Sequence, residues 1–391
     1  MNRQSIEQDL LAWMAEPRWR DDDDRFARLA LALFAAQFDA CEPYAAYCRS
    51  LDRAPDTIRR WQEIPAVPTG AFKEFALRSF PEAETLHTFR TSGTSVERRG
   101  TLYLDTLAIY EASLLSSLRR LFLTDLCGRS PRMRFLAPAA SDQPDSSLSH
   151  MFETLLRVEG DPEDSAFDWR DGQIDRAALE AALSRARMAE APVVIAGTSF
   201  AFVHLLDGLA GRDGEGGEGG EGGAMDWPVD SRLPLPPGSR VMETGGFKGR
   251  SREIPRDVLR VAIARCFALD ERSVINQYGM TELGSQFYDS TLVDRDGPRR
   301  KLVPPWVRVR FVDPEAGREV EEGEVGLVVI HDLANTGSVA AIQTADLGRA
   351  IVDDRGQRIG FDVLGRGEGA EARGCSIAAD AMLAAGGGEG E

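Results

Sequence analysis

Lysine is scarce in this sequence, and arginine carries nearly all of the positive charge. Among 46 basic residues only Lys73, Lys248 and Lys301 are lysines, and the formal net charge is −17. Nucleic acids and anionic membranes require a concentrated basic face on a binding protein. The composition therefore argues against both as the main partner, and any phosphate-binding site has to be a local arrangement.

Cysteine is also sparse, and its spacing excludes the usual frameworks. The five cysteines form no Cys-x-x-Cys pair, so neither a disulfide scaffold nor a zinc site is expected. Cys41, Cys48, Cys127 and Cys266 fall in predicted helices or at their ends, where cysteines are usually small buried hydrophobes. Only Cys375 lies in a segment expected to be mobile.

Long apolar runs are missing as well. No stretch approaches the roughly 18 consecutive apolar residues of a membrane-spanning helix. The N-terminus carries Glu7 and Asp9 where a signal peptide would need an apolar run. We therefore expect a cytoplasmic protein without a membrane span.

Apolar periodicity predicts an α/β fold with a largely parallel sheet, because strand-like runs alternate with helical ones. Residues 6–47 have helical spacing interrupted by the acidic run 21–24, which is expected to cap a helix. Further helices are predicted at 71–77, 107–122, 179–188, 199–209 and 256–267, and one beginning at Ser146; strands are predicted at 133–137, 192–198, 240–243 and 273–278.

Composition changes along the chain suggest its organisation. Residues 1–303 are expected to form an α/β core with an N-terminal helical part. Residues 304–364 contain short β-like segments (307–312, 325–331, 340–344, 350–352 and 362–364) and predict a small antiparallel subdomain. Residues 213–224 repeat Gly-Gly-Glu and predict a disordered loop. Residues 365–391 form a Gly/Ala/Glu-rich tail that carries Cys375.

A hydroxyl-rich loop, Thr91-Ser92-Gly93-Thr94-Ser95, precedes a strand-like segment at 101–105. Backbone N–H groups and hydroxyls in such a loop can surround a polyanion such as a triphosphate. Clusters of Ser, Thr and Gly are also common in plain turns. The loop alone therefore leaves both interpretations open.

A second segment, Tyr278-Gly279-Met280-Thr281-Glu282, closes a predicted buried strand. Open α/β sheets bind ligands at the carboxyl ends of their strands. Tyr278 offers an aromatic face, Thr281 a hydroxyl, and Glu282 a carboxylate able to hold Mg²⁺ on a nucleotide phosphate. The alternative is that Glu282 is a surface carboxylate beside a turn.

Two further segments are compatible with a nucleotide. Gly245 and Gly246 follow another predicted strand and would let the backbone approach a flat ligand closely. Asp346 lies just after a predicted strand and is suited to accept hydrogen bonds from ribose hydroxyls. Each has a simpler interpretation, as an ordinary strand-to-helix turn and as a turn aspartate.

Taken in order, these segments resemble the adenylate-forming superfamily, which includes acyl-CoA ligases and adenylation domains. The resemblance implies ATP- and Mg²⁺-dependent activation of a carboxylic acid to an acyl-adenylate with release of pyrophosphate. It also implies roles for individual residues: phosphate binding by Thr91, Ser92, Gly93, Thr94 and Ser95; adenosine binding by Gly245, Gly246, Tyr278, Gly279 and Asp346; phosphate and metal binding by Thr281 and Glu282; and the hinge and ribose edge at Arg366.

The sequence also departs from the superfamily pattern. Val96 stands where a second loop glycine is usual, Ala345 replaces the glycine before the ribose aspartate, and no lysine ends the loop. The chain ends shortly after Arg366, so we expect the superfamily's C-terminal domain, with its catalytic lysine, to be truncated. Lys248 and Lys73 compete for the role of that lysine, and Lys248 is favoured because it follows Gly245-Gly246.

This pattern is similar to the acyl-protein synthetases of the LuxE type. The resemblance implies that a fatty acid is activated and then transferred to Cys375 as a thioester for delivery to an acyl-CoA reductase partner. Glycines on the N-terminal side of Cys375 would give its thiol the necessary reach. His150, at the start of a predicted helix, is a candidate for the acyl site, although a lone histidine is more often structural.

Two alternatives remain open at this stage. A phenylacetate-CoA-ligase-like enzyme would hand the acyl group to CoA or to a carrier protein. A nucleotide-binding protein with a decayed site, altered at Val96 and Ala345, would bind without catalysis. The identity and the chain length of the acid are not encoded in any motif.

Overall fold

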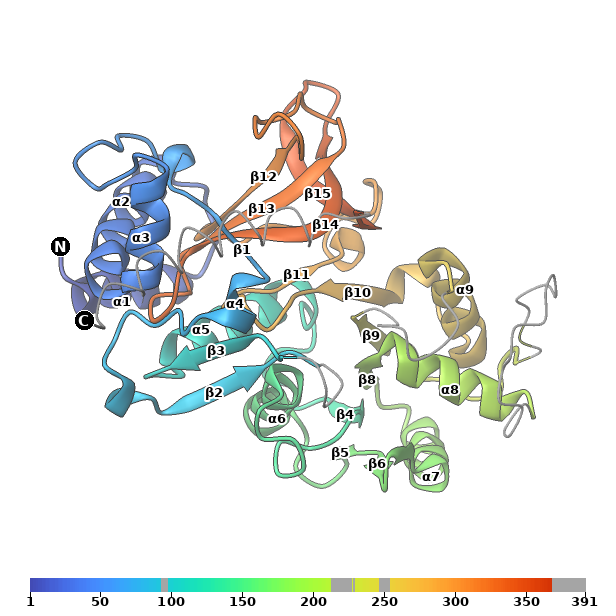
Figure 1. The fold of residues 1–391 in the computed structure, drawn as a ribbon. Coiled ribbons are helices and arrows are strands. Elements are labelled where there is room, and N and C mark those ends of the chain that lie inside the picture. The colour runs from blue at the N-terminus through green and yellow to red at the C-terminus, as the bar shows by residue number, and fades with distance from the viewer. Residues whose placement is uncertain (93–97, 212–226, 228, 246–253, 368–391) are drawn as a thin grey trace.

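The computed structural model describes residues 1–92, 98–211, 227, 229–245 and 254–367. Strands of two larger sheets alternate with helices through most of this range (Figure 1), as the predicted α/β class requires. The α-helices are α1 (Arg3–Met14), α2 (Asp23–Ala40), α3 (Glu42–Ser50), α4 (Ala71–Glu74), α5 (Ala108–Leu121), α6 (Ser147–Glu159), α7 (Arg176–Met188), α8 (Ser199–Leu209) and α9 (Arg256–Phe267).

The larger sheet is mostly parallel. Its strand order is β11-β10-β9-β8-β4-β5, and only β11 runs antiparallel to its neighbour. Its strands are β4 (Arg132–Leu136), β5 (Ala166–Phe167), β8 (Val193–Thr198), β9 (Arg240–Thr244), β10 (Val274–Tyr278) and β11 (Phe287–Tyr288). The predicted strands in this part of the chain are thus confirmed.

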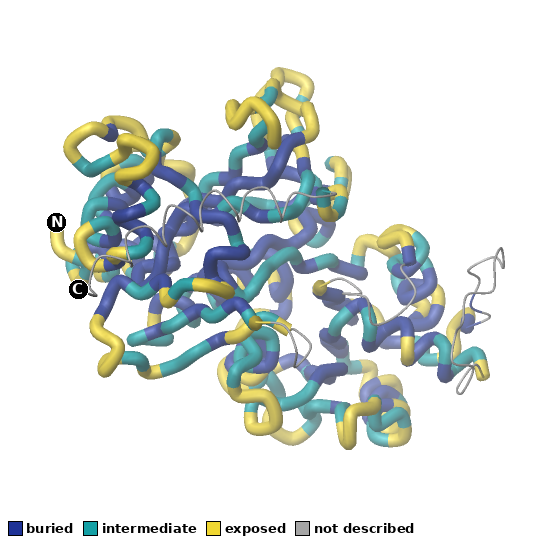
Figure 2. The backbone as a smooth tube through the Cα atoms, in the orientation of Figure 1, coloured by how far each residue is buried: buried dark blue, intermediate teal, exposed yellow. Residues whose placement is uncertain are grey.

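The apolar runs of this sheet explain its position in the core. Every residue of β9 is buried, as are the first five residues of β8, and Figure 2 shows both strands in dark blue. Strands covered on both faces are typical of parallel sheets with helices on each side. The hydroxyls of Ser146 and Thr198 then cap α6 and α8 by accepting from the Ser149 and Ala201 amides at 3.2 and 3.0 Å.

The second sheet contains the predicted antiparallel segments and one strand from far upstream. The order is β1-β14-β13-β12, with β15 also pairing with β14. Its members are β1 (Val67–Pro68), β12 (Val307–Val312), β13 (Gly326–Asp332), β14 (Ala341–Val352) and β15 (Arg358–Arg366). Because β1 joins β14 in parallel, this sheet is continuous with the N-terminal part of the chain.

Two predicted β segments, 340–344 and 350–352, are a single strand in the structure. β14 runs through both, and Asp346 lies within it and not after it. The register against β15 shifts between Leu347 and Gly348. This local irregularity occurs where the apolar alternation of the sequence breaks, which explains why the sequence suggested two short strands.

The N-terminal helices pack against the second sheet, and Figure 1 shows α1, α2 and α3 beside it. The Asp22 side chain accepts from the Arg25 amide at 2.9 Å, so the acidic run caps α2 as expected. Helix α4 is shorter than the predicted 71–77. The remaining strands form two hairpins, β2 (His87–Arg90) with β3 (Thr101–Leu104), and β6 (Trp169–Arg170) with β7 (Gln173–Ile174).

One expectation about the cysteines is wrong. Cys41, Cys48 and Cys266 are buried, but Cys127 is exposed. Helix α5 ends at Leu121, and Cys127 follows in a turn, where its thiol lies 3.4 Å from the Arg119 carbonyl oxygen. The predicted helix 107–122 and α5 end within one residue of each other, so Cys127 lies beyond the helix, where no packed helical face buries its side chain. Cys375 lies outside the described residues.

Candidate functional site

A cavity of about 520 Å³ opens at the carboxyl ends of the parallel strands. Leu136, Thr198, Thr244 and Gln277 line it from the ends of four adjacent strands. This is the edge at which open α/β sheets bind ligands, and the volume lies within the usual range of ligand pockets. Other lining residues come from the hairpin β2–β3, α5, the segment that leads into α6, and the residues that follow β9 and β10; they include Arg90, Ser92, Arg99, Tyr110, Gln143, Asp145, Ser147, Gly245, Gly279, Met280, Thr281 and Gln286.

The two ends of the hydroxyl loop are held together. The Thr91 amide donates to the Gly100 carbonyl oxygen, and the Gly100 amide donates to the Thr91 hydroxyl oxygen, both at 2.8 Å. The loop therefore leaves and re-enters the β2–β3 hairpin at one point. Ser92 faces the cavity, whereas Gly93, Thr94 and Ser95 lie outside the described residues.

Arg99 fixes the base of this loop. Its Nε donates to the Thr91 carbonyl oxygen at 2.6 Å, and its guanidinium pairs with the Asp145 carboxylate at 2.8 Å. The Asp145 carbonyl oxygen in turn accepts from the Arg90 amide at 2.8 Å. The loop is thus joined to the segment that leads into α6, and both line the cavity. The sequence contained no periodic signal for this contact, because the partners are 46 residues apart.

Glu282 lies next to the loop. A Cβ atom added to Gly100 would be 3.2 Å from the Glu282 Oε1 and 3.1 Å from the Thr91 methyl group. Glu282 is 6% exposed, and its backbone carbonyl oxygen accepts from the Asn335 amide group at 2.7 Å. The structure therefore brings together Thr91 and Glu282, two residues that the sequence assigned to phosphate and metal binding.

Tyr278 and Asp346 are also brought together. The Tyr278 hydroxyl donates to the Asp346 Oδ2 at 2.8 Å. Burial, followed by the negative charge of Asp346, raises the pKa of Tyr278 well above its usual value, so the phenol keeps its proton and acts as a donor. Asp346 on β14 stands opposite Arg366 on β15, and directly opposed residues of an antiparallel pair share one face of the sheet.

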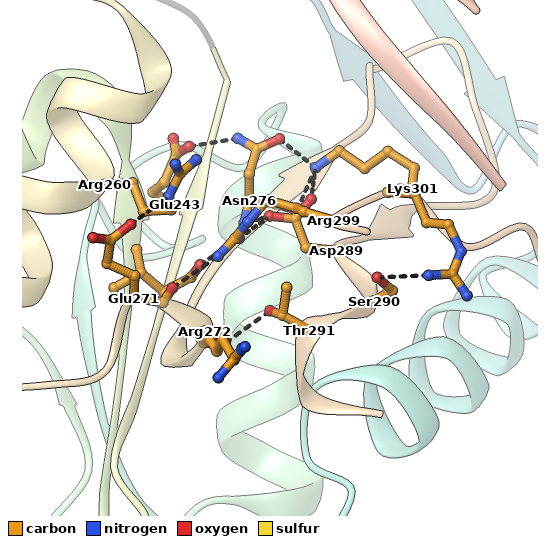
Figure 3. Close-up of polar contacts among 12 residues, drawn as sticks. Glu243, Arg260, Glu271, Arg272, Asn276, Asp289, Ser290, Thr291, Arg299 and Lys301 are labelled. Carbon is orange, nitrogen blue, oxygen red and sulfur yellow. Dashed lines mark hydrogen bonds and ion pairs between the residues drawn. The ribbon is translucent and has the colours of Figure 1, made fainter. Parts of the chain in front are cut away.

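A largely buried network of polar side chains lies behind the cavity (Figure 3). Glu243 on β9 accepts from the Asn276 amide group on β10 at 2.5 Å. The Lys301 ammonium donates to the side-chain oxygen of Asn276 and pairs with Asp289 at 2.8 Å. Burial alone would raise the pKa of Asp289, but the charges of Lys301 and Arg299 outweigh it and lower that pKa. Sequence reasoning missed this network because its members come from separate elements.

Six predicted site residues lie outside the described residues: Gly93, Thr94, Ser95, Gly246, Lys248 and Cys375. Five others are described but do not line the cavity: Thr91, Tyr278, Glu282, Asp346 and Arg366. Lys73, the alternative to Lys248, is exposed on α4. The third lysine, Lys301, is buried in the network described above. The position of a catalytic lysine therefore stays a prediction.

His150 belongs to an aromatic cluster beside the cavity. Its ring centroid lies 5.3 Å from that of Phe89 and 5.8 Å from that of Tyr110, and its Nε2 is 3.2 Å from Glu111. Burial lowers the pKa of His150 although Glu111 opposes this shift. In the described part of the chain Tyr110 lines the cavity and His150 does not, which favours the structural interpretation of this histidine.

The residues present fit a nucleotide with a metal ion. The cavity is lined by hydroxyl, amide and guanidinium groups. A side chain at position 279 would come within 2.6 Å of the Gln277 side-chain amide nitrogen, and one at position 100 would crowd Thr91 and Glu282. Among the described residues no group of three or more His, Cys, Asp and Glu side chains is arranged to hold a metal by itself. A Mg²⁺ ion here would take ligands from the phosphates together with Glu282, as is usual for this ion.

Comparisons with known proteins agree with this arrangement. A family profile described as "Acyl-protein synthetase, LuxE" matches residues 231–384. The long-chain-fatty-acid–luciferin-component ligase of Aliivibrio fischeri is 24% identical over 358 residues, which covers 88% of this chain and 85% of the relative. The enzyme of the same name from Vibrio harveyi is 21% identical over 389 residues, covering 95% and 93%.

Solved structures show the same fold. An open conformation of 2-hydroxyisobutyryl-CoA ligase, in complex with 2-HIB-AMP and CoA, superposes with a TM-score of 0.58 at 14% identity, covering 88% of this chain and 76% of that one. The post-adenylation state of the same ligase gives a TM-score of 0.59 at 15% identity, covering 88% and 68%. None of the helices in the described ranges is long and apolar enough to cross a bilayer.

Proposed function

Since this chain is LuxE-like in sequence and has the fold of an adenylate-forming ligase, we propose that it is an acid–thiol ligase that activates a carboxylic acid with ATP. In the first step a carboxylate oxygen attacks the α-phosphorus of ATP, the bond from that phosphorus to the β-phosphate oxygen breaks, and pyrophosphate leaves. The product is a mixed anhydride of the acid and AMP.

The geometry that supports this step is the contact between Tyr278 and Asp346 at 2.8 Å, directly before the segment Gly279 to Thr281 that lines the cavity. Asp346 has acceptor oxygens for the ribose hydroxyls, and Tyr278 keeps the carboxylate in place. Thr91 and Ser92 offer hydroxyls to the phosphates. A Mg²⁺ ion held by Glu282 would add positive charge where negative charge develops, which is where electrostatic stabilisation contributes most.

In the proposed second step the Cys375 thiolate attacks the acyl carbonyl carbon, the bond to the phosphate oxygen breaks, and AMP leaves. The acyl group then remains on sulfur as a thioester. Both relatives are named for a long-chain fatty acid, and we propose the same substrate class here. An acyl-CoA reductase that accepts the thioester is the proposed partner, and a cytoplasmic location stays a prediction.

Replacing Cys375 by serine tests the second step. Radiolabelled fatty acid and ATP should label the wild-type protein, and the label should be released by hydroxylamine, as expected of a thioester. The Cys375→Ser variant should lose this label, whereas Cys127→Ser, which removes the exposed cysteine of the described region, should keep it. Undiminished labelling of the Cys375→Ser protein would refute the transfer.

A second candidate is transfer of the acyl group to CoA. It is favoured by the structural likeness to a ligase whose complex contains CoA. Adding CoA to the wild-type reaction distinguishes the two. Formation of acyl-CoA by the Cys375→Ser variant at the wild-type rate would establish CoA as the acceptor, and failure to form acyl-CoA, together with labelling of Cys375, would exclude it.

A further inference from the structure

The buried network behind the cavity contains one hydroxyl with more acceptors than protons. Ser199, at the start of α8, lies 2.5 Å from the Glu243 Oε2 and 3.0 Å from the carbonyl oxygen of Gly245. Ser199 and Glu243 are each 4% exposed. Gly245 lines the cavity and has a positive φ of 82°, a conformation that costs glycine little. Because backbone preference does not fix this glycine, the orientation of the Gly245 carbonyl depends on the hydrogen bonds that it accepts.

The orientation of the network can be read from its far end. Lys301 has only protons to donate, so the side-chain oxygen of Asn276 must face it and accept. The Asn276 amide group then points away from Lys301 and donates to the Glu243 Oε1 at 2.5 Å. Figure 3 shows Lys301, Asn276 and Glu243 in this order. One carboxyl oxygen of Glu243 is thus an acceptor.

The other carboxyl oxygen faces a hydroxyl that is already engaged. The Gly245 carbonyl oxygen can only accept, and Ser199 has a single proton, which it can donate either to this carbonyl at 3.0 Å or to the Glu243 Oε2 at 2.5 Å. If Glu243 were ionised, the two acceptors would compete for this proton, and one of the two contacts would lack a hydrogen. One added proton on Glu243 satisfies every contact from Lys301 to Gly245.

We propose that Glu243 is an uncharged carboxylic acid and a positioning residue, which donates to Ser199 and through it holds the Gly245 carbonyl at the wall of the nucleotide subsite. The assignment of that subsite rests on the proposed function. Each group then donates to the next in a single direction, from Lys301 through Asn276, Glu243 and Ser199 to the Gly245 carbonyl oxygen.

The charges around Glu243 agree with this assignment. Burial raises the pKa of Glu243, although its bonds to Ser199 and Asn276 and the charges of Lys301 and Arg256 oppose the shift. Lys301 does not depend on Glu243 for a counter-ion, because Asp289 pairs with it at 2.8 Å. Asp289 also pairs with Arg299, whose side chain reaches solvent with a quarter of its surface exposed. The deeply buried charges are therefore balanced when Glu243 is neutral.

Infrared spectroscopy tests the charge state directly and requires no activity. The difference spectrum between wild type and Glu243→Gln should contain the C=O stretch of a protonated carboxyl group at pH 7. This band should disappear at high pH as the group ionises. If only an ionised-carboxylate band is lost in the variant at pH 7, the assignment of a neutral Glu243 is wrong.

ATP binding measured by calorimetry tests the positioning role. Ser199→Ala removes the link to Gly245 and should weaken ATP binding about tenfold, the effect of one lost hydrogen bond in a buried site, with the affinity for the acid unchanged. Glu243→Ala should weaken it similarly. Glu243→Gln, which can donate to Ser199 and accept from Asn276, should recover most of this affinity.

Ser117→Ala is a matched control, because this buried serine on α5 has no hydrogen-bond partner among the described residues. Melting temperatures identify any variant that is misfolded. An ATP affinity of Ser199→Ala equal to that of Ser117→Ala would refute the positioning role, as would a Glu243→Gln protein as weak as Glu243→Ala. Failure of the wild type to bind ATP would instead refute the proposed function, while the infrared band still decides the state of Glu243.

Discussion

The hydroxyl of Tyr278, at the end of β10 in the parallel sheet, donates to the carboxylate of Asp346, within β14 of the other sheet, at 2.8 Å. These residues are 68 positions apart and belong to different sheets. Their contact therefore links the parallel sheet to the second sheet. Arg366, which pairs with Asp346 from β15, lies beside this contact. The segment after Tyr278 continues directly into the cavity wall.

Tyr278→Phe should raise the KM for ATP by about tenfold, because the loss of a hydrogen bond to a charged group costs roughly 1.5 kcal/mol or more. Asp346→Asn should have at least this effect, since it also removes the charged acceptor for the ribose. The double variant should be less impaired than the product of the two single effects. Tyr47→Phe is the control, because its hydroxyl bonds the Ala66 carbonyl away from the cavity. Strict additivity would show that the two side chains act independently.

Gly100→Ala should lower kcat, because the new methyl group would be 3.1 Å from the Thr91 methyl and 3.2 Å from the Glu282 Oε1. Both contacts are shorter than ordinary van der Waals distances, so the loop and the carboxylate must move apart. Misplacement of about 1 Å at a reacting centre can reduce rates about 100-fold. Steady-state kinetics of pyrophosphate release measures the effect.

A second substitution tests the reason for that loss. Thr91→Ser removes the crowded methyl group but keeps the hydroxyl that accepts from the Gly100 amide. Combined with Gly100→Ala, it should restore part of the lost activity, whereas alone it should change little. A double variant that is no better than Gly100→Ala would mean that the methyl contact does not cause the defect.

Stability should depend on pH through Asp332, a fully buried carboxyl group in β13. Burial raises its pKa to about 6, although Ser285 and the Ala334 amide donate to it. A raised folded-state pKa means that the folded protein binds this proton more tightly than the unfolded chain. The stability contributed by this bound proton is fully present below about pH 4. It is lost as pH rises through about 6, and the total loss is about 2–3 kcal/mol.

Asp332→Asn cannot titrate and should therefore gain stability relative to wild type between pH 4 and pH 7, measured as the free energy of unfolding in urea. The comparison has to be made between variants, since burial also lowers the pKa of the adjacent His331 to about 3, and its effect has the opposite sign. Exposed Asp354→Asn serves as the control. If the difference between Asp332→Asn and wild type is constant with pH, Asp332 does not titrate in this range.

The sequence predicted the elements of the fold better than their contacts. Apolar runs such as 192–198 and the hydroxyl before α6 are local signals, and local chemistry decides them. The merging of 340–344 and 350–352 into β14 was not predictable, because the pairing of β14 with β13 and β15 holds the irregular stretch extended. Strand pairing overrides local propensity there.

In the candidate site, too, residues in local motifs were predicted, whereas contacts between distant residues were not. Tyr278, Glu282 and Asp346 were identified from their positions in short motifs, and the structure brings Glu282 to Thr91 and Tyr278 to Asp346. Arg99–Asp145 and the Glu243–Asn276–Lys301 network were missed. Their partners lie on separate elements, so their chemistry exists only after the sheets and helices have assembled, and no single spacing in the sequence encodes it.

Carboxylate-dependent exchange of radiolabelled pyrophosphate into ATP tests the central proposal most directly, because it detects acyl-adenylate formation whatever the final acceptor is. A scan over fatty and aryl acids of different length should show exchange that depends on the acid and on Mg²⁺. Glu282→Gln should reduce this exchange by 100-fold or more while keeping the wild-type melting temperature, since its carbonyl bond to Asn335 remains. Exchange that is absent for every acid, or equal in wild type and Glu282→Gln, would contradict the account.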